Sequence, residues 1–335
     1  MTTATPLIEV DNLAVTLNTS RGPAPAVRGV TFSLARGETL GLVGESGCGK
    51  SITALALMGL LPDGAVVGGG IRLDGRELVG LPDADYCKLR GNRISMIFQE
   101  PMTALNPMHT IGRQVAEPLR RHTRCSVAEA RRQAIALLDR VGLPDAIRRV
   151  DAYPHQFSGG QRQRITIAMA LACQPDLLIA DEPTTALDVT IQGQILDLIA
   201  DLVAERGMAM ILISHDLGVI AENVRRMLVM YGGTVVESGT TKSVFSRMGH
   251  PYTQGLFRAR PRLGARKGTR LKTIAGTVPE LADLPLGCAF SGRCPIVEDR
   301  CRAALPEMVE VDDGHDVRCR RTDVSLAGAV AVFGA

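Results

Sequence analysis

Short apolar runs separated by glycine-rich turns fill the first hundred positions of the chain, and their length and composition predict strands. Four runs are expected to be strands: 8–17, 30–34, 38–43 and 94–99. The third run leads directly into a glycine-rich loop. Residues 51–61 after that loop have the composition of a helix, which the turn sequence Pro-Asp-Gly at 62–64 ends. The first part of the chain therefore predicts a strand, a loop and a helix in succession.

Apolar positions change to helical spacing between residues 100 and 157. Ser126 and Glu129 have the spacing of a capping box at the start of a helix. The apolar positions that follow recur at helical spacing: Val127, Ala130, Ala134, Leu137 and Val141. We therefore expect a mostly helical insertion over this stretch.

Short buried strands return in the second half of the chain. Residues 177–180 (LLIA) and 208–214 (MAMILIS) are continuous apolar runs, and a helix is expected between them at about 189–206. This alternation predicts an α/β fold with a largely parallel sheet and helices on its faces. A nucleotide site is then expected at the carboxyl ends of the strands. From about residue 241 the alternation fades, and residues 258–285 carry many Arg, Gly and Pro.

The composition argues against several classes of protein. Aromatic residues make up only 3% of the 335 positions and tryptophan is absent, which disfavours a stacking platform for single-stranded nucleic acid. The 38 Lys and Arg nearly balance the 35 Asp and Glu, so the chain lacks the global basic footprint of a nucleic-acid binder. The N-terminal residues do not resemble a secretory signal, and no run of 18 apolar residues is present. Any membrane role is therefore expected to depend on a partner.

Residues 44–51, GESGCGKS, match the phosphate-binding motif G-x-x-x-x-G-K-[ST] between the predicted strand and helix. The glycines allow backbone N–H groups to curl around phosphates at a helix N-terminus. Lys50 adds a positive charge that supports catalysis, and Ser51 offers a hydroxyl to Mg²⁺. The thiol at the variable position of the loop is expected to be inert. The residues expected to bind nucleotide here are Gly44, Glu45, Ser46, Gly47, Cys48, Gly49, Lys50 and Ser51.

Polar side chains follow three of the predicted strands. Asp181 is expected to hold Mg²⁺ and Glu182 to polarise the attacking water, as acids at the end of a buried strand do in NTPases with such a loop. The amide of Gln99 can reach Mg²⁺ or water. His215 follows the strand at 208–214 and is expected to support hydrolysis. The predicted ligands of Mg²⁺ are therefore Ser51, Gln99 and Asp181.

A second glycine-containing motif, FSGGQ, occupies residues 157–161 and precedes a predicted helix. Ser158 can cap this helix, and its free N–H groups form an anion site. A plain N-cap is the simpler interpretation. In the functional interpretation, Ser158, Gly160 and Gln161 bind a nucleotide phosphate that another subunit holds.

Four of the eight cysteines lie within the last 48 residues: Cys288, Cys294, Cys301 and Cys319. Because no secretory signal is expected, a metal site is favoured over a disulfide framework. Their spacing is not the paired C-x-x-C of common zinc sites, although zinc stays an alternative, as do four free thiols. His315 is expected to be a surface residue rather than a ligand.

Six motifs occur in one order along the chain: GESGCGKS, Gln99, FSGGQ, LLIADE, TALD (185–188) and SHD. They cover about residues 7–240 and resemble an ATP-binding cassette ATPase. The resemblance implies a RecA-like P-loop core with a helical subdomain. It also implies a head-to-tail dimer in which Ser158 and Gly160 contact the ATP of the partner and Asp188 lies at the interface.

Five further segments resemble the ATPase subunits of dipeptide and oligopeptide uptake systems: QEPMTALNP (99–107), YPHQFSGGQRQR (153–164), SHDLGVIAE (214–222), HPYT (250–253) and AGTVPELADLPLGCAFSGRC (275–294). The resemblance implies a peripheral subunit on the cytoplasmic face of the inner membrane. Its implied partners are two integral-membrane permease subunits, a second related ATPase and an extracytoplasmic solute-binding protein. It also implies a [4Fe–4S] cluster on the tail cysteines. Nickel and glutathione importers share much of this pattern, so the cargo stays open.

The resemblance divides the chain into four segments. These are the first part of the ATPase core (1–99), the helical subdomain (100–157), the signature helix with the rest of the core (158–245) and a small metal-binding C-terminal extension (246–335). Two residues depart from the family pattern. Leu17 stands where many cassettes have an aromatic residue that stacks on adenine, and Phe157 replaces a leucine at an apolar packing position.

A soluble cassette ATPase that acts on nucleic acid is the alternative from a different class. It predicts basic stripes, coiled coils or zinc modules inside the ATPase core, and the sequence has none of these. A regulatory cassette without turnover is disfavoured by Lys50, Glu182 and His215, and the tail favours uptake over export. The sequence therefore predicts the ATP-hydrolysing subunit of a peptide importer, with ATP and Mg²⁺ as cofactors and no nucleic-acid partner.

Overall fold

The computed structural model describes residues 6–185, 187–259 and 273–327. Two compact units interleave along the chain. The first unit falls within Met1–Ile8, Leu34–Glu38 and Leu73–Leu212, and the second within Glu9–Ser33, Thr39–Arg72 and Ile213–Ala335. The four-segment division expected from the sequence stays a prediction.

The sheet of the first unit contains the predicted buried strands. β6 (Ile94–Ile97) pairs in parallel with β7 (Leu177–Asp181), and β8 (Ala209–Ser214) is the next strand after β7. Every residue of these strands is buried, as expected for a sheet that is covered on both faces. β6 ends two residues earlier than predicted, since the side chain of Phe98 is already 40% exposed.

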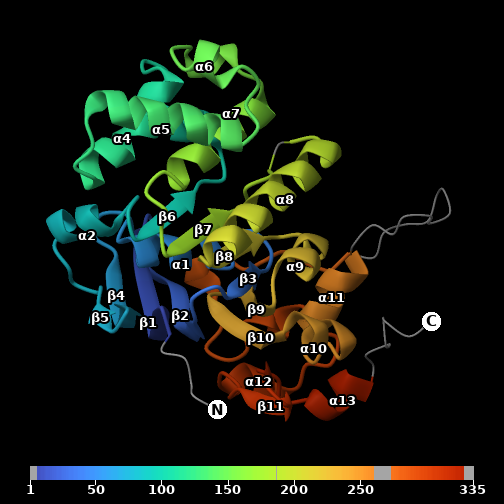
Figure 1. Ribbon diagram of the computed structural model, residues 1–335. Helices are drawn as coiled ribbons and strands as arrows, with labels where there is room; N and C mark the ends of the chain where they lie inside the picture. The colour runs from blue at the N-terminus through green and yellow to red at the C-terminus, as the bar shows by residue number, and fades with distance from the viewer. Residues whose placement is uncertain (1–5, 186, 260–272, 328–335) are drawn as a thin grey trace. The chain divides into compact units, whose positions relative to one another are not determined.

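The remaining elements of the first unit are mostly helices: β5 (Arg76–Glu77), α2 (Asp83–Leu89), α3 (Pro101–Ala104), α4 (Ile111–His122), α5 (Val127–Arg140), α6 (Ala146–Arg149), η1 (Pro154–Gln156), α7 (Gly159–Ala170) and α8 (Val189–Arg206). Helices α4, α5, α6 and α7 pack as one group (Figure 1). The mostly helical character predicted for residues 100–157 is confirmed.

Helix α5 begins where the sequence predicts. The side chain of Ser126 accepts a hydrogen bond from the N–H of Glu129 at 3.2 Å. The predicted capping box is incomplete, because the Glu129 carboxylate instead accepts from Arg132 and Gln133 within the helix. The buried positions inside α5 are Ala130, Ala134 and Leu138.

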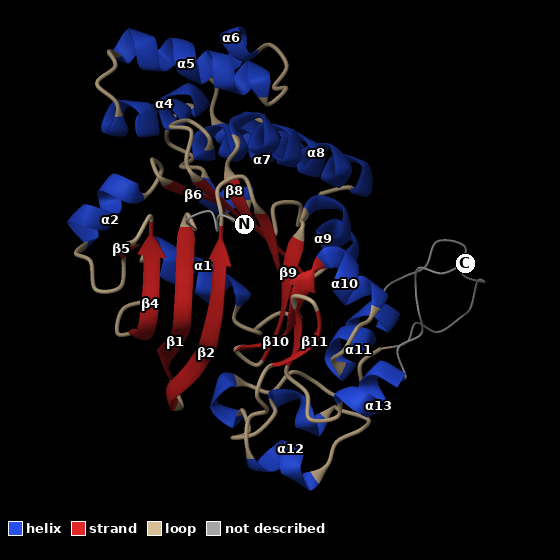
Figure 2. Cartoon of the chain, turned by 60° about the horizontal axis from the view of Figure 1, so that its bottom comes forward, coloured by secondary structure: helices blue, strands red, loops and turns tan. Residues whose placement is uncertain are grey.

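A first sheet of the second unit contains long strands near the N-terminus. β2 (Gly22–Leu34), β1 (Ile8–Thr19) and β4 (Val66–Leu73) are neighbours in that order (Figure 2). β1 and β2 are longer than predicted because a tight turn joins them. The hydroxyl of Thr19 donates to the carbonyl of Gly22 at 2.7 Å and accepts from the N–H of Arg21 at 3.2 Å.

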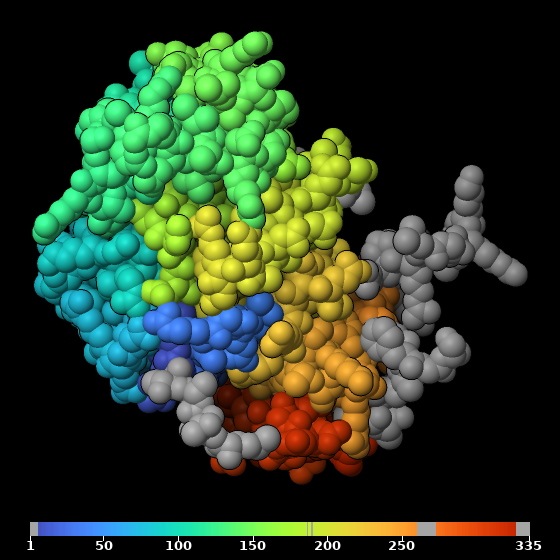
Figure 3. Space-filling model, viewed as in Figure 1, coloured from blue at the N-terminus to red at the C-terminus, as the bar shows by residue number. Residues whose placement is uncertain are grey.

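The other strands of this unit are only partly parallel. β3 (Thr39–Val43) pairs in parallel with β9 (Arg226–Tyr231), and β10 (Thr234–Thr240) pairs with β9 in the antiparallel direction. The tail then adds two antiparallel strands, because β12 (His315–Val317) pairs with β10 and β11 (Val309–Asp312) with β12. In Figure 3 the red tail residues accordingly lie directly against the orange residues around β10.

The helices of the second unit are α1 (Lys50–Met58), α9 (Leu217–Asn223), α10 (Thr241–Ser246), α11 (Pro251–Ala259), η2 (Leu281–Asp283), η3 (Ala289–Gly292), α12 (Asp299–Ala303) and α13 (Thr322–Ala327). Helix α1 ends earlier than predicted because Gly59, with φ of 60°, closes its last turn. Regular structure continues through α11, beyond the predicted fade at residue 241. Within the described residues, no helix is both long enough and apolar enough to cross a membrane.

Candidate functional site

The loop between β3 and α1 curls tightly, as a phosphate-binding loop requires. Gly44 and Gly49 have φ of 154° and 103°, and both lie against other backbone. A Cβ atom on Gly44 would stand 2.2 Å from the carbonyl oxygen of Met230, and one on Gly49 would stand 2.7 Å from that of Ala26. Any larger residue would therefore push the loop off the sheet.

The curled loop encloses the side chain of Lys50, which is only 5% exposed. Its Nζ atom donates to the carbonyl oxygens of Gly44 at 2.7 Å and Glu45 at 3.1 Å. Cys48 is fully buried beside it, and burial raises the pKa of the thiol. The loop therefore presents a positive charge together with backbone N–H groups, and Cys48 is closed to solvent.

Two residues of the C-terminal extension form hydrogen bonds with Glu45, the second residue of the phosphate loop. The guanidinium of Arg293 donates to both carboxylate oxygens of Glu45, at 2.7 and 3.2 Å, and its side chain is only 6% exposed. The hydroxyl of Tyr252 accepts from the N–H of Glu45 at 2.7 Å. No local sequence pattern predicted a role for either residue. The segments that contain them, HPYT and SGRC, were noted only as marks of resemblance.

The two acids at the end of β7 differ in environment. Asp181 is 5% exposed and closes the strand. Glu182 has φ of 44°, a left-handed backbone that non-glycine residues rarely adopt. Its Oε2 atom accepts from Nε2 of Gln99 at 3.2 Å and from the hydroxyl of Thr185 at 3.0 Å. The structure thus brings Gln99 and Glu182 together, although Gln99 lies past the end of β6.

The FSGGQ motif forms the N-terminus of α7. Oγ of Ser158 accepts from the N–H of Gln161, and the side chain of Gln161 accepts from the N–H of Ser158, so this capping box is complete. These two residues, Gly160 and Asp188 line one cavity of the first unit. Phe157 is buried, as its packing position predicts. The motif residues and Asp188 therefore face a shared space.

The SHD motif follows β8. The hydroxyl of Ser214 accepts from the N–H of Asp216, and Asp216 caps α9 by accepting from Gly218 at 2.6 Å. These two contacts fix the turn that carries His215, whose side chain is exposed. Lys50, Ser51 and His215 belong to the second unit, and Gln99, Ser158, Asp181 and Glu182 to the first.

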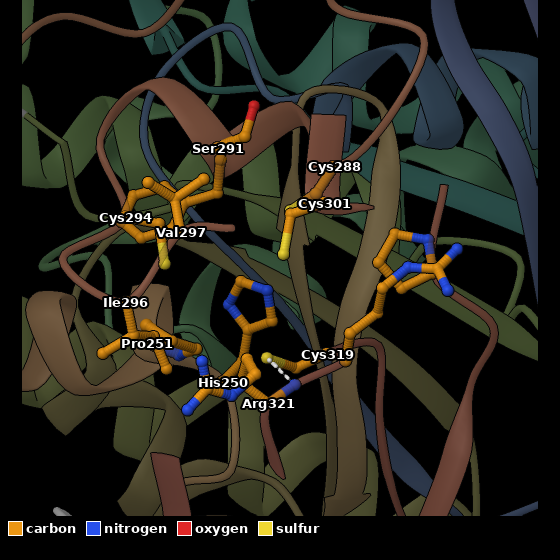
Figure 4. Close-up of a pocket in the computed structure, with 13 residues that line it drawn as sticks. His250, Pro251, Cys288, Ser291, Cys294, Ile296, Val297, Cys301, Cys319 and Arg321 are labelled. Atoms are coloured by element: carbon orange, nitrogen blue, oxygen red, sulfur yellow. Dashed lines mark hydrogen bonds between the residues drawn. The ribbon is translucent and has the colours of Figure 1, made fainter. Parts of the chain in front are cut away.

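The four tail cysteines line one cavity, together with His250 and Phe290 (Figure 4). Burial raises the pKa of the Cys319 thiol to about 11, and it also raises the pKa of Cys288 and Cys294. In the described part of the chain, no three His, Cys, Asp or Glu side chains are arranged to hold one metal ion. The four cysteines thus share one cavity, but the predicted metal-binding character of the extension is not shown.

The prediction that His315 is a surface residue is wrong. Its side chain is fully buried, because β12 joins the sheet beside β10 and turns the imidazole inward. Nε2 of His315 lies 2.8 Å from a carboxylate oxygen of Glu237, which is also fully buried. The same carboxylate accepts from the N–H groups of Gly249 at 2.6 Å and His250 at 2.9 Å. His315 therefore anchors the tail to the sheet.

Comparison with known families gives two matches that together span most of the chain. Residues 27–185 match the family model described as "ABC transporter". Residues 236–301 match the model described as "Oligopeptide/dipeptide transporter, C-terminal region". The phosphate loop, the FSGGQ motif, Asp181 and Glu182 lie in the first match, and Tyr252, Arg293 and three tail cysteines lie in the second.

Individual relatives are similar over almost their whole length. A putative peptide import ATP-binding protein of Brucella abortus is 50% identical over 94% of this chain and 97% of its own. The dipeptide transport ATP-binding protein DppD of Bacillus subtilis is 48% identical over 97% of both chains. Among solved structures, the ATP-binding cassette MJ0796, in a dimeric post-hydrolysis state bound to ADP and Pi, is 29% identical with a TM-score of 0.63. That match covers 70% of this chain and 98% of the cassette.

Proposed function

The chain belongs to the ABC transporter ATPases that carry the oligopeptide/dipeptide transporter C-terminal region, and from this premise we propose that it powers the import of dipeptides or oligopeptides. The observation that carries the proposal is the joint presence of cassette motifs and the peptide-transporter tail in one chain. The near full-length similarity to the B. subtilis dipeptide transport protein supports the same substrate class.

In this proposal, each cassette motif has the role in ATP binding or hydrolysis that its sequence predicts. The loop N–H groups and Lys50 bind its phosphates, and Ser51, Gln99 and Asp181 offer the hydroxyl, amide and carboxylate oxygens that Mg²⁺ prefers. The hydrogen bonds from Gln99 and Thr185 orient the Glu182 carboxylate, which then polarises the attacking water. His215 supports hydrolysis from its exposed turn.

The chain is further proposed to work as part of a larger assembly. The cavity at the start of α7 supports a role for Ser158 and Gly160 in binding the ATP of a second, related ATPase. Two permease subunits and an extracytoplasmic solute-binding protein complete the assembly, with this chain peripheral on the cytoplasmic face of the inner membrane. No nucleic-acid partner is proposed.

Co-purification tests this proposal. Tagged chain is isolated anaerobically from detergent-solubilised membranes, and its ATPase rate is measured with binding protein plus short peptides or nickel. We expect permease subunits to co-purify and peptides to stimulate turnover. Stimulation by nickel alone would redirect the substrate assignment to a metal importer. A chain that is isolated alone and is stimulated by DNA would overturn the transporter role.

We also propose that Cys288, Cys294, Cys301 and Cys319 hold a [4Fe–4S] cluster. Four thiolates are the usual ligand set of this cluster, and these four line a single cavity. Zinc is the alternative occupant. Either group would stabilise a tail whose described elements after α11 have six residues or fewer.

Metal analysis of anaerobically purified chain tests the cluster. We expect iron and acid-labile sulfide in equal amounts in the wild-type chain and neither after the four cysteines are replaced by Ser. Replacement of Cys87, Cys125 and Cys173, which lie outside the tail, is the control and should leave the iron content unchanged. Zinc without sulfide would identify the alternative occupant, and an unchanged metal content in the tail variant would exclude a site at these cysteines.

A further inference from the structure

A cavity lies directly beside the phosphate loop of the second unit. Ser46 and Gly47 of the loop line one side of it, and the β1–β2 turn (19–21) lines another. The remaining wall is formed by residues 278–282 of the tail. A nucleotide whose phosphates bind the loop would therefore extend between the turn and the tail.

Ion pairs connect these two walls. The guanidinium of Arg21 donates to Oε2 of Glu280 at 3.0 Å and to both carboxylate oxygens of Asp283 at 2.7 Å. This planar group is held by two carboxylates although it is 52% exposed. Thr19, two residues before Arg21, closes the β1–β2 turn with its two hydrogen bonds. The turn and the tail are thus joined by ion pairs at this cavity.

The lining chemistry suits a flat heterocycle. None of the described residues that line the cavity is aromatic, and Leu17 precedes the turn. Arginine guanidinium groups stack on flat rings, as aromatic side chains do. Val278, Pro279 and Leu281 are half-buried and give the tail wall an apolar surface. Apolar contact with these side chains would remove part of a base from water.

We propose that this cavity holds the base of ATP, with Arg21 and the tail segment 278–282 replacing the stacking aromatic residue of other cassettes. The inference rests on the proposed binding of ATP phosphates by the loop. It makes the C-terminal extension a direct part of the nucleotide site. Two parts of the tail then serve the nucleotide, since Arg293 holds Glu45 of the loop and residues 278–282 contact the base.

Photolabelling of the full chain tests the position of the base. The chain is irradiated with 8-azido-ATP and Mg²⁺, and the labelled peptides are identified by mass spectrometry, with excess ATP as the competitor. We expect competed label within residues 19–21 or 278–282. Competed label found only outside both segments would overturn the inference, and this measurement needs no substitution that could unfold the chain.

Binding of ATP and inorganic triphosphate to full-length variants separates the base from the phosphates. We expect Arg21→Ala and Leu281→Ser each to weaken ATP binding about fivefold, or about 1 kcal/mol, without changing the affinity for triphosphate. Leu286→Ser, on the tail at 86% exposure, is the control and should change neither affinity. Lys50→Ala should weaken both ligands.

The Lys50 variant tests the assignment of the phosphate loop, and the Arg21 and Leu281 variants test the proposed position of the base. If Lys50→Ala has no effect on either ligand, the assignment of the phosphate loop is wrong. If Lys50→Ala weakens both ligands but the Arg21 and Leu281 variants bind ATP normally, the loop assignment stands and the base does not occupy this cavity.

Discussion

Glu182 combines an acidic side chain with a backbone conformation that costs energy. Its φ of 44° lies in the left-handed region, where a non-glycine residue is typically destabilised by about 1–3 kcal/mol. Gln99 and Thr185 hold its carboxylate from two sides. Such strain persists where surrounding structure fixes it, and it is frequent at catalytic residues. The geometry therefore supports Glu182 as the residue that polarises water.

Replacing Glu182 with Gln should separate ATP binding from hydrolysis. The amide keeps the size of the side chain but cannot polarise water as a carboxylate does, so we expect turnover to fall about 100-fold or more with ATP affinity retained. ATPase rates and equilibrium binding of labelled ATP measure the two effects. Glu205→Gln, at an exposed glutamate of α8, is the matched control. Full turnover in the Glu182 variant would refute the assigned role.

At the scale of single residues, the sequence predicts best those site residues that stand in short local motifs. Gly44, Lys50 and Ser158 stand in short motifs whose spacing already specifies loop and cap geometry. The bond between Arg293 and Glu45 joins residues 248 positions apart, and no local pattern predicts such a contact. The left-handed φ of Glu182 was also unpredicted, because a strand-end Asp-Glu dipeptide does not specify it.

Secondary structure elements were predicted best where apolar runs are long or strongly periodic. β7, β8 and α8 occupy the expected positions because continuous apolar runs and helical spacing identify them. β4, β9 and β10 were not predicted, and β11 and β12 were missed because each has at most four residues and β12 pairs with the distant β10. Their absence from the prediction also explains the error about His315, which is buried only because β12 joins β10.

We expect the buried carboxylate of Glu237 to be the main contact that holds β12 against β10. Replacing Glu237 with Ala leaves His315 and two backbone N–H groups buried without their acceptor, so we expect destabilisation by about 3 kcal/mol or more. Denaturant titration of the full chain and hydrogen exchange of residues 315–317 measure this loss. Glu307→Ala, at an exposed position before β11, should have little effect. Equal behaviour of the two variants would show that the buried contact does not stabilise the tail.

At the scale of the whole molecule, the order of the sequence motifs predicted the function more specifically than the predicted strands and helices did. Six cassette motifs and the tail cysteines indicated an ATPase of the peptide-transporter kind, and the family matches agree. The sequence did not show that the tail is built into the second unit by strand pairing and by contacts to Glu45. Those contacts depend on long-range packing, which propensity and spacing do not encode.

The measurement that tests the central claim most directly is peptide uptake by the reconstituted assembly. The chain is incorporated into proteoliposomes with the permeases and the second ATPase that co-purify, and labelled short peptide is added with the binding protein. We expect uptake that requires ATP and is abolished by Glu182→Gln but not by Glu205→Gln. ATP hydrolysis without peptide uptake, or uptake that persists in the Glu182 variant, would contradict the account.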